Sequence, residues 1–407
     1  MEKTKILEIA KKTIKKYQLC DNCIGRLFRE FNKEVSNKQK GVSIRNKLKF
    51  DKKVSPNDCW LCEGLINEIP HFASLISEVL KNYEFTTFLV GSKVDDDIIQ
   101  REKDLWDLIE SKDSESESIK MEINREVGKI LEENLKKTVD FKTPDIMAVV
   151  DTSYDVVNLQ IKSIFIYGRY KKLERGFPQT KWFCKFCRGI GCKACNYKGK
   201  LYDSSIEELI SKEALVLSKG SDASFHGSGR EDIDALMLGN GRPFVLEIKN
   251  PKIRNIDLSI YKKTTNNNAE KKIEVNNLRF TNGEEIVRIK STEFNKTYKI
   301  IVESEKPLNK EKLKEVARLL QGKTIRQMTP TRVSHRRALI VRERKIYNCD
   351  IESVEGNIAK IKIETESGMY IKELISGDNG KTIPNLSDMI GIPCIVKELD
   401  VTEIKGE

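Results

Sequence analysis

The sequence predicts an α+β protein in which an N-terminal α/β module precedes a C-terminal domain built on a large, mostly antiparallel sheet. Three observations support this fold class. The chain has 407 residues, enough for two or three domains. Helical and strand patterns alternate in its first part, whereas strand patterns dominate after residue 201. Eight of the ten cysteines form CxxC pairs, at the start of the chain and between the two parts.

Composition excludes several classes of protein. The chain has 73 Lys+Arg against 62 Asp+Glu, a net charge of +11, and 39% of its residues are hydrophobic. That apolar content excludes a wholly disordered chain. No run approaches eighteen consecutive apolar residues, and the Lys-rich segment Met1–Leu19 lacks the apolar core of a secretory signal. We therefore expect a cytoplasmic protein with no membrane segment and a preference for polyanions. We also expect no obligate protein partner and a monomeric state.

The first part of the chain is expected to alternate helices and strands. Apolar residues recur at helical spacing over residues 3–18 and 119–137. Strand patterns occupy residues 85–90, 144–150 and 157–167. Residues 95–118 hold ten acidic against three basic residues, so a solvated loop is predicted there.

The later part of the chain is expected to be mainly strands. A capping box at Ser205 predicts one helix, and Leu313–Leu320 predicts another with Asn309 as its cap. The polar segment Tyr261–Lys272 is predicted to be a mobile loop. Strand patterns occupy residues 244–248, 285–289, 298–302, 338–341, 358–363 and 395–399. Together these strands predict the large antiparallel sheet.

The four CxxC pairs predict two metal sites. Two thiolates on one tight turn can bind the same ion, and four sulfurs suit tetrahedral zinc. A reducing compartment disfavours disulfides, and a redox motif would need one CxxC pair rather than four, so structural zinc is the favoured interpretation. The expected ligands are Cys20, Cys23, Cys59 and Cys62 at the first site, and Cys184, Cys187, Cys192 and Cys195 at the second.

The segment Phe225–Pro251 combines glycines, arginines and spaced carboxylates. Arg230 lies two residues before Asp232, and a neighbouring arginine keeps a carboxylate ionised and fixes its geometry. An ionised, oriented carboxylate can be a nucleophile, a base or a metal ligand. One interpretation of this segment is therefore that Asp232 is a lone nucleophile.

A second interpretation of the same segment is a metal-dependent nuclease. Asp234 with Glu247 and Lys249 would form a D…ExK site, since the last two share one face of a predicted strand. That pattern is short and common by chance. The sequence alone leaves both interpretations open.

Two further segments carry polar residues suited to RNA. Lys323–Lys345 has eight basic residues and one acidic residue, so it is expected to contact phosphates. The phosphate contacts expected there include Arg332, Arg336 and Arg337. In Glu366–Asn385, Tyr370 and Lys372 precede a glycine-rich turn.

The motifs GREDID…MLGNGRPF, TPTRVSHRRA and MYIKELISGDNGKTIPNL together resemble the archaeal-type tRNA pseudouridine synthases that modify positions 54 and 55 of the TΨC loop. The resemblance covers essentially the whole chain. It implies a helix and zinc-binding region over residues 1–64, a THUMP-like RNA-binding module over 65–178, a zinc-knuckle-like cluster over 179–200 and a catalytic domain over 201–407.

The resemblance also implies roles for individual residues. Asp232 would be the nucleophile, oriented by Arg230, and Tyr298 would pack on the target uracil. Tyr370 and Lys372 would be further substrate contacts. It implies tRNA as the partner, zinc as a structural ion and no organic cofactor. A non-catalytic tRNA-binding protein remains a third hypothesis.

Overall fold

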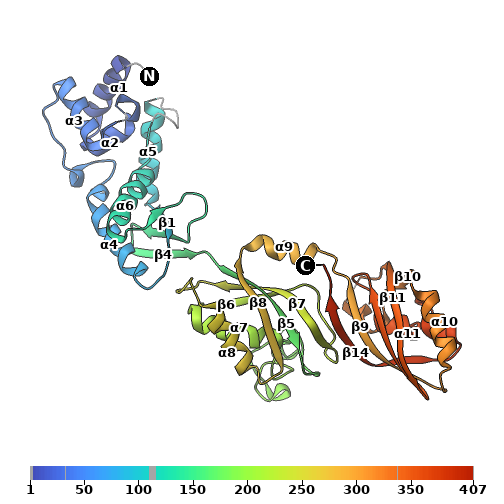
Figure 1. Ribbon diagram of the computed structural model, residues 1–407. Helices are drawn as coiled ribbons and strands as arrows, with labels where there is room; N and C mark the ends of the chain where they lie inside the picture. The colour runs from blue at the N-terminus through green and yellow to red at the C-terminus, as the bar shows by residue number, and fades with distance from the viewer. Residues whose placement is uncertain (1–2, 33, 110–115, 337, 407) are drawn as a thin grey trace. The chain divides into compact units, whose positions relative to one another are not determined.

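The computed structural model describes residues 3–32, 34–109, 116–336 and 338–406 (Figure 1). The chain folds into two compact units. Unit 1 comprises Met1–Lys162 and Asn250–Arg254, and unit 2 comprises Ser163–Lys249 and Asn255–Glu407. None of the helices in the described ranges combines the length and hydrophobicity needed to span a bilayer.

Unit 1 begins with a helical cluster. The predicted N-terminal helix is present as α1 (Lys3–Lys16), which buries Ile6, Ala10 and Ile14. Two close-packed helices follow, with three short 3-10 turns in the same region. These elements are α2 (Asp21–Leu27), η1 (Arg29–Phe31), α3 (Asn37–Leu48), η2 (Pro56–Asp58) and η3 (Leu65–Glu68). A Cβ atom at Gly25 would lie 1.8 Å from the Asn37 carbonyl oxygen, so glycine is what lets α2 and α3 pack this closely.

The rest of unit 1 is an α/β module, as predicted. Its four-stranded sheet has the order β2-β1-β3-β4, in which β1 is parallel to both neighbours and β3 is antiparallel to β4. The strands are β1 (Thr87–Lys93), β2 (Thr138–Val139), β3 (Ile146–Asp151) and β4 (Val156–Ile161). The helices α4 (Ile69–Leu80) and α6 (Ile119–Leu135) pack on the sheet and on each other (Figure 1).

The predicted solvated loop at residues 95–118 is wrong over most of its described length. The segment forms α5 (Asp96–Leu108), and the side chain of Asp95 caps it by accepting from the Asp97 amide. Acidic residues in a first turn suit the positive end of the helix dipole, and Ile98 and Leu105 are buried. Residues 110–115 of the predicted loop lie outside the described ranges.

Unit 2 contains the large, mostly antiparallel sheet that the sequence predicts. Its ten strands follow the order β13-β10-β11-β12-β9-β14-β7-β5-β8, with β6 also paired to β7. Only the β14–β7 pairing is parallel among these described strands. The strands are β5 (Ile164–Lys172), β6 (Asp222–Gly227), β7 (Leu236–Lys249), β8 (Ile273–Thr281), β9 (Lys296–Ser304), β10 (Thr324–Met328), β11 (Val341–Glu355), β12 (Ile358–Thr365), β13 (Thr382–Ile383) and β14 (Cys394–Ile404).

Both predicted helices of the later part are present. They are α7 (Ile206–Ser218), capped by Ser205, and α10 (Lys310–Leu320), capped by Asn309. The remaining helical elements of unit 2 are η4 (Lys193–Cys195), α8 (Leu258–Asn268), α9 (Gly283–Ser291), η5 (Thr331–Arg336), α11 (Ile371–Ser376) and α12 (Leu386–Ile390).

Three predictions for unit 2 are wrong in whole or in part. Most of the expected loop Tyr261–Lys272 belongs to α8, where Asp257 caps the helix and the Tyr261 hydroxyl donates to the Ile210 carbonyl at 2.9 Å. The expected strand at residues 285–289 is the helix α9. Asn282 caps α9, whose first turn is acidic and whose last turn is basic, and Ile289 is buried. The strand expected at 338–341 begins only at Val341.

A short excursion of the chain belongs to unit 1 although its neighbours in sequence belong to unit 2. The Glu84 amide donates to the Lys252 carbonyl at 2.7 Å, and the Arg254 amide donates to the Glu84 carboxylate at 2.7 Å. The Arg254 side chain reaches Asp145 at 3.4 Å and the Lys162 carbonyl at 2.7 Å. The chain therefore passes between the units three times.

Candidate active site and metal centres

A pocket in unit 2 brings together four segments that are far apart in the sequence. It is lined by the loop Arg230–Asp234 between β6 and β7, by Arg332 of η5 and by Lys372 of α11. The remaining lining comes from Pro178, Gln179, Thr180 and Trp182. The GREDID loop, the basic segment and the MYIKEL segment therefore meet at one place.

The Asp232 carboxylate is paired with two cations in this pocket. Its Oδ2 lies 3.2 Å from Arg332 Nη1 and 3.4 Å from Lys372 Nζ. Lys372 Nζ also lies 2.8 Å from Asp234 Oδ2. Burial by itself would raise the pKa of Asp234, but the hydrogen bond and charge of Lys372 hold that pKa below its usual value. The Asp232 side chain is one-third exposed, so a ligand in the pocket can reach it.

Arg332 is itself held by a carboxylate that the sequence analysis missed. Its Nε lies 2.7 Å from Oε1 of Glu373, and its Nη2 donates to Oε2 at 3.4 Å, a two-point contact. Glu373 is buried in α11 next to Lys372. The adjacent Lys and Glu of MYIKEL thus organise the two cations at Asp232, one by direct contact and one through Arg332.

A buried ion pair anchors the loop that carries Asp232. Arg242 Nε lies 2.7 Å from Oε2 of Glu231, and each of these side chains is only 1% exposed. The Tyr170 hydroxyl donates to the same carboxylate at 3.0 Å, and Arg242 Nη1 donates to the Ser228 carbonyl at 2.8 Å. Glu231 directly precedes Asp232, so this network fixes the backbone from which Asp232 projects. Composition gave no signal for it, because the pairing is between positions on different elements.

Two further contacts define the same region. Lys172 donates to the Ile233 carbonyl at 2.7 Å, beneath the loop. Tyr298 of β9 is buried, and burial raises its pKa to about 12, opposed by the charge of Arg242 and assisted by that of Asp232. Lys296, two residues earlier, donates to Ser367 at 3.2 Å, and burial lowers its pKa to about 8. Because the charge of Asp232 contributes to the raised pKa of Tyr298, these two side chains lie within electrostatic reach of each other.

The structure places the remaining predicted site residues, Arg230 as the residue that orients Asp232 and the others as substrate contacts, to different extents. Arg230 lines the pocket with Asp232. Tyr370 precedes α11, and Arg342 donates to its hydroxyl at 3.3 Å and stacks over its ring at 5.5 Å. Arg337 lies outside the described residues, as does the side chain of Arg336, whose backbone ends η5.

The geometry argues against the D…ExK nuclease site. Glu247 is opposite Phe165 in the β5–β7 ladder, whereas Lys172, seven residues further along β5, contacts Ile233 beside Asp234. At about 3.3 Å per residue the two places are roughly 23 Å apart along β5. Lys249 pairs instead with Asp222 at 3.0 Å. Asp234 and Glu247 therefore cannot share one metal ion.

The first four cysteines form a group that could hold a metal ion. Their Sγ atoms all lie within 4.8 Å of one another, and those of Cys20 and Cys62 are 3.8 Å apart. Four ligands at a Zn–S distance of about 2.3 Å sit at about 3.8 Å from each other in a regular tetrahedron, whereas a disulfide would need about 2.05 Å. The helix α3 occupies the long interval between the two CxxC pairs.

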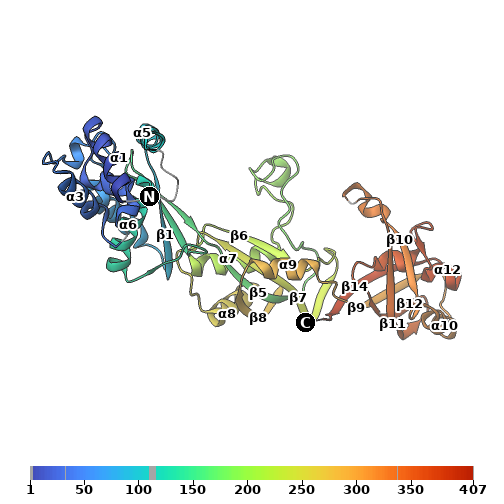
Figure 2. The same ribbon diagram turned by 90° about the horizontal axis from the view of Figure 1, so that it is seen from above.

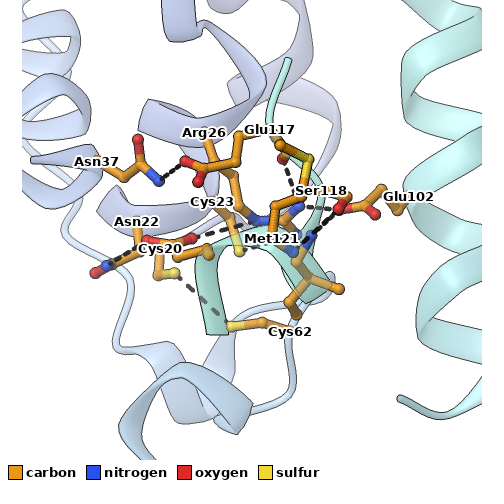
Figure 3. A network of polar contacts seen from close by, with 12 residues as sticks. Cys20, Asn22, Cys23, Arg26, Asn37, Cys62, Glu102, Glu117, Ser118 and Met121 are labelled. Carbon is orange, nitrogen blue, oxygen red and sulfur yellow. Dashed lines mark hydrogen bonds and ion pairs between the residues drawn. The ribbon is translucent and has the colours of Figure 1, made fainter. Parts of the chain in front are cut away.

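A fully buried arginine connects this cysteine group to α5 and α6 (Figure 3). Arg26 donates to Cys23 Sγ at 3.6 Å, forms an ion pair with Glu102, and approaches Glu122 at 3.8 Å. A tetrathiolate zinc centre carries a charge of −2, so a buried cation beside it lowers the cost of burying that charge. Glu102 lies in the segment 95–118, for which the sequence predicts a solvated loop.

The second cysteine group has similar spacing on a shorter turn. The Sγ atoms of Cys184 and Cys192 are 3.9 Å apart, and those of Cys187 and Cys195 are 3.8 Å apart. Backbone amides donate to the sulfurs, for example Gly199 to Cys195 at 3.2 Å. Such N–H···S contacts favour thiolates. Both cysteine groups could therefore hold a zinc ion.

Comparison with known proteins identifies the family. Residues 165–405 match the family model of the Pus10 C-terminal region, and residues 72–151 match the archaeal Pus10 THUMP domain. The chain is 40% identical to the tRNA pseudouridine synthase Pus10 of Methanocaldococcus jannaschii, over 96% of this chain and 93% of that protein. It is 37% identical to the protein of the same name from Halorubrum lacusprofundi, over 99% and 97%. The chain therefore belongs to the Pus10 family of pseudouridine synthases, as its motifs predicted.

Proposed function

We propose that this protein isomerises uridine to pseudouridine in the TΨC loop of tRNA, at position 54, 55 or both, with Asp232 as the nucleophile. The observation that carries the proposal is the setting of Asp232. Its carboxylate faces a pocket, is paired with Arg332 and Lys372, and projects from a backbone anchored by the Glu231–Arg242 pair. Membership of the family supplies the class of reaction and substrate.

The chemistry requires an ionised carboxylate close to the ribose. The reaction breaks the C1′–N1 bond, turns the uracil, joins C5 to C1′ and removes the proton from C5. Asp232 would either attack C1′ or assist glycal formation, and both routes begin from its ionised form. Arg332 and Lys372 form ion pairs with the Asp232 carboxylate, and Arg230, which lines the same pocket, would help to orient it.

Substrate contacts follow from the surrounding residues. A uridine in a folded loop must leave its stack before it can enter the pocket, and packing on an aromatic ring offsets part of that cost. We assign this packing to Tyr298 and a second uracil contact to Tyr370. Lys372, Arg332, Arg336 and Arg337 would balance the charge of the substrate or contact tRNA phosphates.

The cofactor requirement proposed here is structural. Both cysteine groups would bind zinc, which holds the surrounding turns in place, and no organic cofactor would take part. We further propose that the protein works in the cytoplasm, as a monomer, on free tRNA.

The decisive experiment uses an unmodified tRNA transcript. After incubation with the protein, pseudouridine is mapped by carbodiimide modification and reverse transcription. We expect stops in the TΨC loop, intact RNA, and the same yield when magnesium is chelated during the chemical step. Asp232→Asn should abolish the stops while leaving tRNA affinity near that of the wild type.

A neighbouring carboxylate provides the matched control. Asp234 also contacts Lys372 and lines the pocket, so Asp234→Asn perturbs the same electrostatic environment without removing the proposed nucleophile. We expect reduced but measurable modification. An inactive Asp234→Asn together with a fully active Asp232→Asn would overturn the assignment, and cleaved RNA would favour a nuclease.

A further inference from the structure

Residues 181–200 form a small projection that we call the finger. The finger holds the second cysteine group, and a bridge between Phe183 and Lys200 closes its base. Trp182, at that base, lines the pocket that contains Asp232. Figure 2 shows the light-green finger standing away from the sheet formed by β5 to β8. The finger therefore begins at the rim of the candidate active site.

The finger carries charge of one sign. It contains six basic residues and no acidic residue. Lys198 and Lys200 pair with Asp203 and Glu208, which follow the finger. Lys185, Arg188 and Lys193 form no ion pair with any carboxylate in the described ranges. Even with a zinc tetrathiolate of charge −2, the finger keeps a net charge of +4.

The finger also exposes large apolar side chains. Phe186 is 84% exposed, Ile190 is 92% exposed and Tyr197 is 70% exposed. Each lies within or directly after the turns that carry the cysteines, and the cysteine group rather than an apolar core shapes those turns. Gly189 and Gly191 adopt φ values of 106° and 99°, which a side chain would disfavour. The folding of the finger therefore does not require apolar side chains at these three exposed positions.

We propose that the finger binds unpaired bases of the RNA substrate next to the target uridine. Phe186 and Tyr197 stack on bases, while Lys185, Arg188 and Lys193 contact the flanking phosphates. A positively charged surface with exposed rings and no carboxylate fits single-stranded RNA better than a protein partner. Its position supports the same occupant, because any RNA whose base enters the pocket must pass the rim. This inference rests on the proposed function.

The test measures tRNA binding by the full-length, zinc-loaded protein. In the double variant Phe186→Ala/Tyr197→Ala, the dissociation constant for tRNA should rise at least about tenfold, because two stacked bases lose their platforms. Phe186→Tyr and Tyr197→Phe keep flat rings and should bind like the wild type. Val216→Ala on α7 truncates an apolar side chain that is 65% exposed elsewhere in unit 2, and it should leave tRNA affinity unchanged. Zinc content, measured by mass spectrometry, should stay the same in all four.

A variant that removes positive charge from the finger tests the proposed phosphate contacts independently of the stacking. Replacing Lys185, Arg188 and Lys193 by Gln should make the slope of log affinity against log salt shallower by about 2, as expected for three lost phosphate contacts on single-stranded RNA. Single-turnover modification at tRNA concentrations below the dissociation constant should fall in the double alanine variant and in the charge variant, in proportion to their loss of tRNA affinity.

The outcomes separate this inference from the proposed function. Wild-type protein that binds tRNA through the finger but forms no pseudouridine would refute the function alone. Active enzyme with unchanged tRNA affinity in the double alanine variant would refute the finger proposal alone. Loss of self-association or of a bound protein in that variant, without any loss of tRNA affinity, would also refute it and assign the surface to a protein.

Discussion

The buried pair of Glu231 and Arg242 allows a quantitative prediction of stability. Glu231→Gln preserves the shape of the side chain but leaves Arg242 as a buried cation without its counter-ion. Removing one partner of such a pair costs about 3–5 kcal/mol. Because the new amide can still accept from Arg242 Nε and from Tyr170, we expect a loss near the lower end, about 3 kcal/mol in the free energy of unfolding of unit 2.

Urea unfolding can isolate this unit by fluorescence. Of the three tryptophans, only Trp182 belongs to unit 2, so a Trp60→Phe/Trp106→Phe background reports on that unit alone. Glu398→Gln is the matched control, since Glu398 pairs with Arg175 at the surface at 3.2 Å and should contribute less than about 1 kcal/mol. Adding Arg242→Met to Glu231→Gln should recover part of the loss. A Glu231→Gln protein within about 1 kcal/mol of its parent would refute the idea that this pair anchors the loop.

Three more predictions follow from packing, titration and metal binding. Burial lowers the pKa of Lys296 from its ordinary 10.5 to about 8, so between these pH values the unfolded chain binds more protons and stability rises with pH. Lys296→Met should remove this increase in the free energy of unfolding, which is at most about 3 kcal/mol. If urea titrations showed a difference in unfolding free energy between wild type and variant that did not change with pH, the prediction would be contradicted. Gly25→Ala should force α2 away from α3 and lower the melting temperature of unit 1. The control is Gly128→Ala in α6, where the nearest atom to an added Cβ is 4.0 Å away. This control variant should be neutral or more stable by up to about 1 kcal/mol. Cys59→Ser should reduce bound zinc from two ions to one per chain by mass spectrometry, and a count of one ion in both the wild type and the variant would show that the first group holds none.

Apolar residues at helical spacing predicted several helices, whereas other helices were interpreted as loops or as a strand. Both α1 and α6 show a clear apolar face, and both were predicted. The acidic composition of α5 and the polar composition of α8 favoured loops, and the apolar residues of α9 were interpreted as a strand. Each of these three helices nevertheless starts at an Asp or Asn cap, at Asp95, Asp257 and Asn282. A cap followed by two well-spaced apolar residues was thus better evidence than the overall charge of the segment.

The candidate site was predictable residue by residue but not as an arrangement. Asp232, Arg332 and Lys372 were all named from local motifs, yet the last two were interpreted as RNA contacts. Their pairing with Asp232 bridges 100 and 140 positions of the sequence, and it depends on how the fold brings η5 and α11 to the loop before β7. Glu373 and the Glu231–Arg242 pair were missed for the same reason, because an acidic residue next to a motif reveals its partner only after folding.

The excursion at Asn250–Arg254 determines how the protein can be divided. A fragment that ends at Lys162 would lose the partners that Lys252 and Arg254 provide to Glu84 and Asp145, and the complementary fragment would carry those five residues with nothing to bind. No single cut in the chain therefore separates one complete unit from the other, and no single crossover can exchange a complete unit.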